Sequence, residues 1–218
     1  MNYSDLKTEI TDWAHRSNVS EAKVQTFIEL AEAEFNVRLR TVDQETVAEL
    51  VCSSRYTALP SDFLEMRAVE YQGSVLRNLT YATPDFIAQW RSSSPTGESR
   101  AYTLRGTYLE LLPTLGSDDP EVDGFGSDVA PYQSGEVSVT LHYWAKIPAL
   151  SDSNTSNWLL ASHPNMYLYE CLRQLAIYTK DDASIQRYAN LMQGYFVSLT
   201  AHDIGKRFGG SALAIRVS

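Results

Sequence analysis

The sequence has 218 residues, of which 27 are acidic and 18 are basic, so the chain carries a formal net charge of -9. This length suits one large domain or two small ones, and the hydrophobic and charged contents, 44% and 21%, are those of a globular protein. The acidic balance argues against a protein that mainly grips phosphate backbones, because such binding needs clustered cations. No apolar run is long enough to predict a membrane-spanning helix, and two cysteines are too few for a disulfide framework, which fits a reducing compartment.

The first forty residues are predicted to form two helices. In the second of them, apolar residues recur at intervals of three and four, so they should share one buried face. They are Val24, Phe27, Ile28, Ala31, Phe35 and Leu39. Glu29, Glu32 and Asn36 lie on the opposite face of this helix, where we expect them to be exposed to solvent.

A different pattern begins near residue 45. Alternating and β-prone segments separated by turn signals predict strands. These segments are residues 46–52, 56–59, 66–72, 75–79, 102–112 and 137–144. Thr83, Pro84 and Asp85 form a typical helix start, with proline at the first helical position, and they predict one short helix within this β-rich part.

The last third of the chain returns to helix. Pro164 suits the first turn of one helix, and Asp181 and Asp182 separate it from the next. Because helical stripes of apolar residues are not stable in water, the first and last pairs of helices should pack together. The predicted fold class is therefore α+β: a discontinuous four-helix bundle of N- and C-terminal helices, with a β-rich insertion of antiparallel strands. The predicted domains are a helical bundle of residues 1–44 and 157–206, a β-rich insertion of residues 45–156 with one short helix, and an extended C-terminal tail of residues 207–218.

The residues that most often carry catalysis form no recognisable arrangement. The four histidines are scattered over different predicted elements, and the sequence contains neither a nucleophile-elbow motif nor a phosphate-binding glycine loop. We interpret His142 and His163 as structural, and Cys171, which lies on an apolar helical stripe, as a buried thiol. We therefore expect no catalytic, cofactor-binding or metal-binding residues, and no cofactor.

One acidic segment resembles a calcium-binding loop at first sight. Asp119, Glu121 and Asp123 alternate before a glycine, as the ligands of such a loop do. The twelfth position is Ala130, however, where a bidentate glutamate is needed. A solvated acidic loop over residues 117–136 is the better interpretation, and weak cation binding is the alternative.

The end of the chain differs from the rest in charge. Lys206, Arg207 and Arg216 give the last fourteen residues a charge of +3 without any acid. Leu213 and Ile215 flank an alanine in a strand-like alternation, which suits the addition of an edge strand to a partner. The alternative is a frayed terminus.

Several motifs occur together in a recognisable order. Tyr143-Trp-Ala-Lys-Ile-Pro148-Ala-Leu is followed by Asn157-Trp-Leu-Leu and by His163-Pro164. Upstream lie Leu59-Pro-Ser-Asp-Phe63, Tyr102-x-Leu-x-Gly106-x-x-Leu-x-Leu-x-Pro113 and, in the second helix, Glu29-Leu-Ala-Glu-Ala-Glu-Phe35. In this order and over most of the chain, the sequence resembles the head–tail adaptor (connector) proteins of tailed bacteriophages and prophages.

The resemblance implies a structural protein of the virion, made in the host cytoplasm and located at the head–tail junction. It implies a ring of about twelve copies that docks beneath the portal protein and above the next tail or nozzle component. Genomic DNA would pass through the ring without specific binding, and no membrane is involved. Because the C-terminal segment of the family extends toward the portal, the expected portal-binding residues are Arg207, Phe208, Leu213, Ile215 and Arg216.

The same stretch suggests how the sheet is joined to the bundle. Pro148 and Pro164 bracket a rigid structural crossover, and Trp158 and Leu159 are large apolar residues that could pin it onto the helices. The alternatives to an adaptor are a small cytosolic enzyme or a cell-wall hydrolase with an unrecognised site. A DNA-binding regulator is a third possibility and conflicts with the charge balance.

Overall fold

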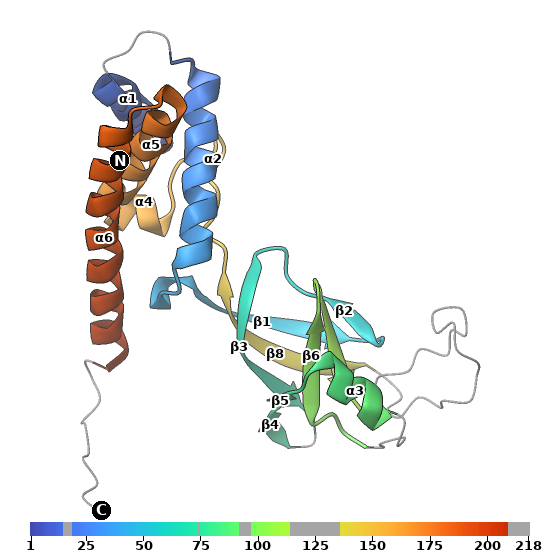
Figure 1. Ribbon diagram of the computed structural model, residues 1–218. Coiled ribbons are helices and arrows are strands. Elements are labelled where there is room, and N and C mark those ends of the chain that lie inside the picture. The colour runs from blue at the N-terminus through green and yellow to red at the C-terminus, as the bar shows by residue number, and fades with distance from the viewer. Residues whose placement is uncertain (15–18, 74, 92–96, 114–135, 209–218) are drawn as a thin grey trace, which may run out of the picture. The chain divides into compact units, whose positions relative to one another are not determined.

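The computed structural model describes residues 1–14, 19–73, 75–91, 97–113 and 136–208 (Figure 1). The chain divides into two compact units. The helical unit consists of residues 1–44 and 146–218, so both ends of the chain build it, and the β unit is continuous from residue 45 to residue 145. The described structure is thus mixed α and β, as predicted.

The helical unit is built around the apolar stripe of its second helix. Its described elements are α1 (Tyr3–Ala14), α2 (Glu21–Arg38), the 3-10 helix η1 (Val42–Gln44), α4 (Trp158–Ser162), α5 (Pro164–Thr179) and α6 (Asp182–Phe208). Every residue of the predicted α2 stripe is buried, in a core shared with apolar side chains of α1, α4, α5 and α6. The ring of Phe35 lies 5.1 Å from that of Tyr167 and 6.4 Å from that of Phe196, so it joins α2 to both α5 and α6.

Polar side chains fix the ends of these helices. Asn2 and Asp5 form a capping box at the start of α1: Asn2 Oδ1 accepts from the Asp5 N–H at 2.8 Å, and Asp5 Oδ2 accepts from the Asn2 N–H at 3.0 Å. Lys180 ends α5 in the left-handed conformation. Asp181 then accepts hydrogen bonds from the N–H and the hydroxyl of Ser184, which starts α6 where a break was predicted.

The β unit consists of two four-stranded sheets that share a core. Its described elements are β1 (Glu45–Cys52), β2 (Tyr56–Ala58), β3 (Phe63–Gln72), β4 (Leu76–Asn78), β5 (Thr80–Tyr81), α3 (Pro84–Arg91), β6 (Ala101–Arg105), β7 (Tyr108–Leu112) and β8 (Val137–Ala145). The strand orders are β1-β8-β3-β4 and β2-β7-β6-β5. Val139 and Leu141 of the first sheet are buried in one cluster with Leu109 and Leu111 of the second, as in a sandwich.

The structure differs from the sequence-based expectation in several places. The expected antiparallel pairing does not hold throughout, because β5 pairs with β6 in parallel. Helix α4 was not predicted, and α6 continues through residues 207 and 208, where an extended tail was expected. Residues 146–156 were assigned to the insertion but belong to the helical unit, because Ile147 and Leu150 are buried in its core. Among the described helices, none is both long enough and apolar enough to cross a membrane.

Candidate functional site

The chain passes from β8 to α4 through residues 146–157, here called the crossing segment, which is held by α2. The Ile147 N–H donates to Asn36 Oδ1 at 2.9 Å, and the Leu150 N–H donates to Glu32 Oε1 at 2.8 Å. Glu32 and Asn36 are four residues apart and therefore lie on one side of α2. They anchor the backbone of the crossing segment at two points.

The expectation that Glu32 and Asn36 are exposed to solvent is therefore wrong. Glu32 is only 6% exposed, and Asn36 is half-buried. Periodicity separates apolar from polar residues, but it does not show which polar residues meet backbone N–H groups that need an acceptor. The available signal was a pair of acceptors four residues apart at the edge of an apolar stripe.

A buried chain of hydrogen bonds continues from Glu32 across the helical unit. The Tyr167 hydroxyl donates to Glu32 Oε1 at 3.2 Å and accepts from Asn157 Nδ2 at 2.7 Å. Asn157 Nδ2 also donates to the Pro148 carbonyl at 2.8 Å, and its Oδ1 accepts from the Leu160 N–H at 2.8 Å, which caps α4. The network thus joins α2, the crossing segment, α4 and α5.

Burial governs the protonation of this network. It raises the pKa of Glu32, and the bonds from the Leu150 N–H and the Tyr167 hydroxyl oppose that rise in part. Burial and the neighbouring Glu32 carboxylate raise the pKa of Tyr167. Tyr167 therefore keeps its proton and donates a hydrogen bond to Glu32.

The predicted crossover residues lie at different depths around this network. Leu159 is fully buried, and the half-buried Trp158 packs against the same core. Pro164 occupies the first turn of α5. Pro148 itself is exposed, and its carbonyl is the part that the structure shows bonded.

Ion pairs fix the C-terminal end of α6. Lys206 Nζ lies 2.7 Å from Asp43 Oδ2, and Arg207 Nε lies 2.8 Å from Asp203 Oδ2. Asp203 Oδ1 also accepts from the Val42 N–H at 2.5 Å. The last turn of α6 is thereby attached to the residues that precede β1.

Only part of the expected portal-binding set falls within the described residues. Arg207 lies in the last turn of α6, with its guanidinium on Asp203, and Phe208 is the last helical residue. Leu213, Ile215 and Arg216 lie outside the described residues. The acidic segment of residues 117–136 lies outside them too, except for Glu136.

Candidate catalytic groups are separated or buried. In the described part of the chain, no three side chains among histidine, cysteine, aspartate and glutamate are grouped so as to hold a metal ion. His142 lies 3.3 Å from Glu70 on β3, whereas burial and the nearby His202 and Lys206 lower the pKa of His163. Cys171 is buried, and burial raises the pKa of its thiol well above the ordinary value.

The β unit contains a buried carboxylate that the motifs did not reveal. Glu110 on β7 has no exposed side-chain surface, and it is bracketed by Arg55, whose Nε lies 3.0 Å from Oε1, and Arg105, whose Nε lies 2.6 Å from Oε2. Two cations compensate one buried anion, so this cluster ties the residue just before β2 to β6 and β7.

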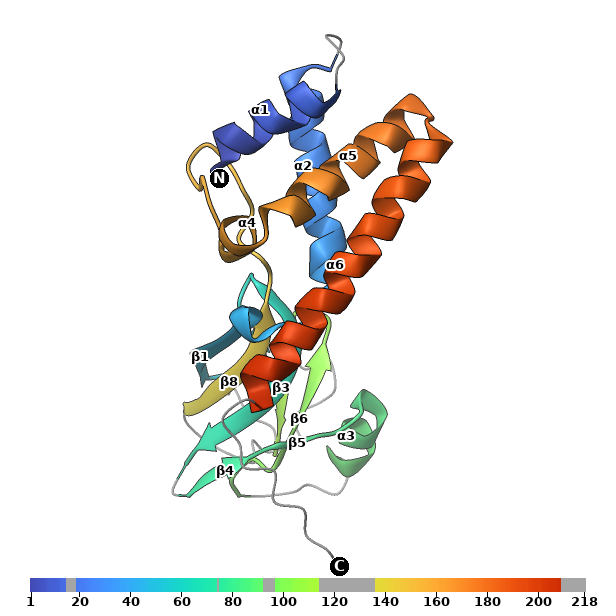
Figure 2. The same cartoon turned by 90° about the vertical axis from the view of Figure 1, so that its left-hand side faces the viewer.

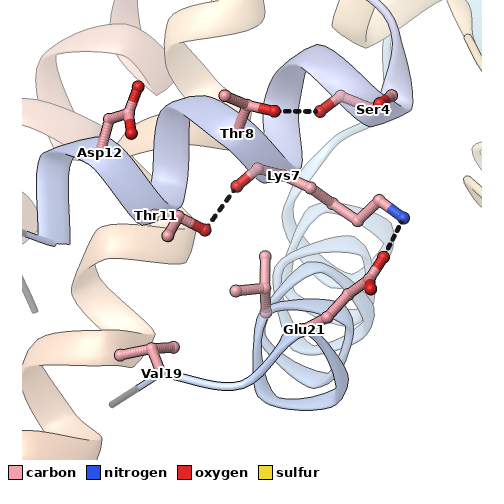
Figure 3. A pocket seen from close by; sticks show the side chains of 8 residues that line it. Ser4, Lys7, Thr8, Thr11, Asp12, Val19 and Glu21 are labelled. Carbon is pink, nitrogen blue, oxygen red and sulfur yellow. Dashed lines mark hydrogen bonds and ion pairs between the residues drawn. The ribbon is translucent and has the colours of Figure 1, made fainter. Parts of the chain in front are cut away.

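A surface hollow of about 390 Å³ lies between α1 and the start of α2 (Figure 3). Lys7 Nζ is paired with Glu21 at 2.7 Å. The hydroxyls of Thr8 and Thr11 donate to the carbonyls of Ser4 and Lys7, at 3.0 Å and 2.9 Å. These polar groups already have partners, and they do not converge as an acid, a base and a nucleophile would.

The polar groups described above hold a chain crossing, a helix end and a strand in place. A family model described as SU10 adaptor protein matches residues 1–213, and this range includes all of the β unit. The chain therefore belongs to the SU10 adaptor protein family, a family of bacteriophage structural adaptors, which confirms the resemblance indicated by the motifs. A search of curated proteins finds no match. Membership places the chain in the virion, in contact with other phage structural components.

Proposed function

We propose that this chain is the subunit of a ring that joins the phage capsid to the tail, beneath the portal protein and above the next tail component. By analogy with head–tail adaptors, the ring contains about twelve copies around the channel for DNA. The observation that carries the proposal is the family match over residues 1–213.

In this proposal the end of the chain binds the portal. Asp43 and Asp203 anchor the last turn of α6, so the segment after Phe208 begins at a fixed point. Leu213 and Ile215 would supply the apolar contacts, and Arg216 the charge. A short alternating segment of this kind can add a strand to a sheet edge of its partner.

A truncation tests the portal contact. A variant lacking residues 209–218 keeps the ion pairs of Lys206 and Arg207, so it should retain the helix content and unfolding temperature of the full chain while losing binding to the portal protein of the same phage. Replacement of Leu213 and Ile215 by serine should have the same effect at unchanged length and charge. Arg216→Lys is the matched control that should still bind. Portal binding by the truncated protein would contradict this assignment.

Electron microscopy tests the ring itself. Purified chain mixed with portal protein, and intact virions, should show a ring of about twelve copies at the head–tail junction. A chain that remains a free monomer in infected cells and on purified portal would contradict the proposed function.

A further inference from the structure

Two helices of the helical unit carry an uncharged stripe on the face that points away from the core. On α2, the outer stripe consists of Ala22, Thr26, Leu30, Ala33 and Val37. All five residues are exposed, and Val37, at 75%, is the most exposed of the described large apolar residues. Intervals of three and four residues place them on one side of the helix, opposite the buried stripe.

A similar outer stripe lies on α6. It consists of Leu191, Gly194, Val197, Ala201 and Ile204, all exposed. Val197 is 59% exposed, and a side chain built at Gly194 would meet no atom within 4 Å. No described residue therefore covers the middle of this stripe.

The two helices lie on different sides of the unit. Figure 1 shows α6 and α2 on opposite flanks, with α5 between them, and the view in Figure 2 agrees, with α6 in front of α5 and α2 behind it. The inner faces of α2 and α6 both pack on the shared core, so their outer stripes face away from each other. A surface on one flank that fits a surface on the other makes a head-to-tail contact, and repeated contacts of this kind close into a ring when the rotation allows.

The positions along the two helices also correspond. Phe27 of α2 contacts Tyr178, just before α6, and Phe35 contacts Phe196, so α2 and α6 run in the same direction with Phe35 level with Phe196. Rotation about an axis that runs along the helices does not change the height of a residue, so Phe35 of one copy stays level with Phe196 of the next.

Counting from that level aligns the two outer stripes. Leu30 then lies level with Leu191 and Ala33 with Gly194, while Val37 lies one residue, about 1.5 Å, past the level of Val197. Ala33 and Gly194 are both small, so the helix axes can approach to about 8 Å at this level.

Neither outer stripe contains a charged residue, although both helices carry charges elsewhere. α2 contains four glutamates against Lys23 and Arg38, a net charge of -2, whereas α6 contains three basic residues against Asp182 and Asp203, a net charge of +1. In a chain with a net charge of -9, copies repel one another over most of their surface. The pairing of α2 with α6 brings together two stripes without charged residues, so it avoids this repulsion at the contact.

We propose that the outer stripe of α2 on one copy packs against the outer stripe of α6 on a second copy, and that this contact is the subunit interface of the ring. The inference rests on the ring proposed above and names the surfaces that close it.

Disulfide trapping tests the contact directly in the full-length chain. The variant Val37→Cys/Val197→Cys should form an intermolecular ladder under mild oxidation in the presence of portal protein, because facing cysteines can bridge at a Cβ separation of about 4 Å. The native Cys52 and Cys171 are buried and should not contribute. Gln25→Cys/Val197→Cys is the matched control, since Gln25 is exposed on another side of α2, and it should give no ladder. Equal ladders in both variants, or none in the first, would overturn the proposal.

Charge substitutions provide a second test that does not depend on oxidation. Val37→Glu alone and Val197→Lys alone should each reduce ring formation on portal at least about tenfold, and the double variant should recover it in part, because the new charges pair. Both sites are exposed, so the unfolding temperature of each variant should match that of the parent chain. Gln25→Glu and Thr200→Lys introduce the same charges beside the outer stripes and should leave the ring intact.

The parent chain, measured in the same experiment, distinguishes failure of the proposed function from failure of the proposed interface. If it forms no ring with portal, the proposed function fails, and this interface fails with it. If it forms the ring while Val37→Glu and Val197→Lys do so equally well, the adaptor function stands and the interface proposed here is wrong. Retention of the ring with loss of portal binding would assign the α6 stripe to the portal instead, and would also overturn the proposal.

Discussion

Tyr167 occupies the centre of the helical unit and does two things there. Its ring packs against Phe35, and its hydroxyl links Asn157 to Glu32. A buried carboxylate without donors would be costly, so the N–H of Leu150 and the hydroxyl of Tyr167 determine whether Glu32 can remain in this core. The crossing segment is thus held by Glu32, whose contribution to the stability of the fold depends on pH.

Glu32→Gln should remove that dependence. Because the pKa of Glu32 is raised in the folded state above its ordinary 4.5, the folded state binds the proton more tightly than the unfolded one. The stabilising effect of the proton is complete below pH 4.5 and is lost as pH rises through the folded pKa. The variant keeps an acceptor at this position without the charge. Its free energy of unfolding should therefore match that of the parent near pH 4.5 and exceed it at pH 7.

Urea unfolding at a series of pH values measures this difference. Glu49→Gln, at an exposed position on β1, is the matched control and should change little at either pH. A gap between Glu32→Gln and the parent that does not vary with pH would contradict the expected role of burial.

At the level of elements, the helices were easier to predict than their connections. The α2 stripe from Val24 to Leu39 follows from spacing alone, because only one face of that helix can be buried. The crossing segment could not be placed, since the burial of Ile147 and Leu150 depends on acceptors more than a hundred residues away in the sequence. The parallel pairing of β5, a two-residue strand, is also a long-range outcome that leaves no periodic signal.

The two units are proposed to be separate folding domains, and an excision tests this. Glu45 pairs directly with Trp144, so the chain enters and leaves the β unit at points about 5 Å apart. Replacement of residues 45–145 by a short glycine–serine linker should therefore leave the helical unit folded, with a cooperative thermal transition in circular dichroism.

A second excision is the matched control for the first. Replacement of residues 45–156 by the same linker also removes residues 146–156 of the crossing segment, with the backbone N–H groups that donate to Glu32 and Asn36. It should cost at least about 3 kcal/mol more, because two buried side chains are lost with their hydrogen bonds. Equal stability of the two shortened chains would place the boundary at residue 156 after all, and a first excision variant that does not fold would contradict a separate helical domain.

For the molecule as a whole, the acidic net charge determines whether the proposed channel would retain DNA. The purified chain, with its net charge of -9, should not retard duplex DNA in a gel at physiological salt, because it cannot replace condensed counterions. A basic protein of similar size is the positive control. Retention of DNA that weakens steeply with added salt would contradict a ring through which DNA passes freely.

The discontinuous helical unit also imposes an order on biosynthesis. Residues 45–145 are contiguous, so the β unit can be completed while later segments are still on the ribosome. Helix α2 cannot complete its packing as early, because its main partner, α5, begins only at Pro164. The ion pair of Asp43 likewise forms only after Lys206 has been synthesised. During that interval the apolar face of α2 has only α1 to pack against in the nascent chain. The period of greatest exposure to aggregation or to chaperones therefore falls after the sheets have formed and before the last helix is released.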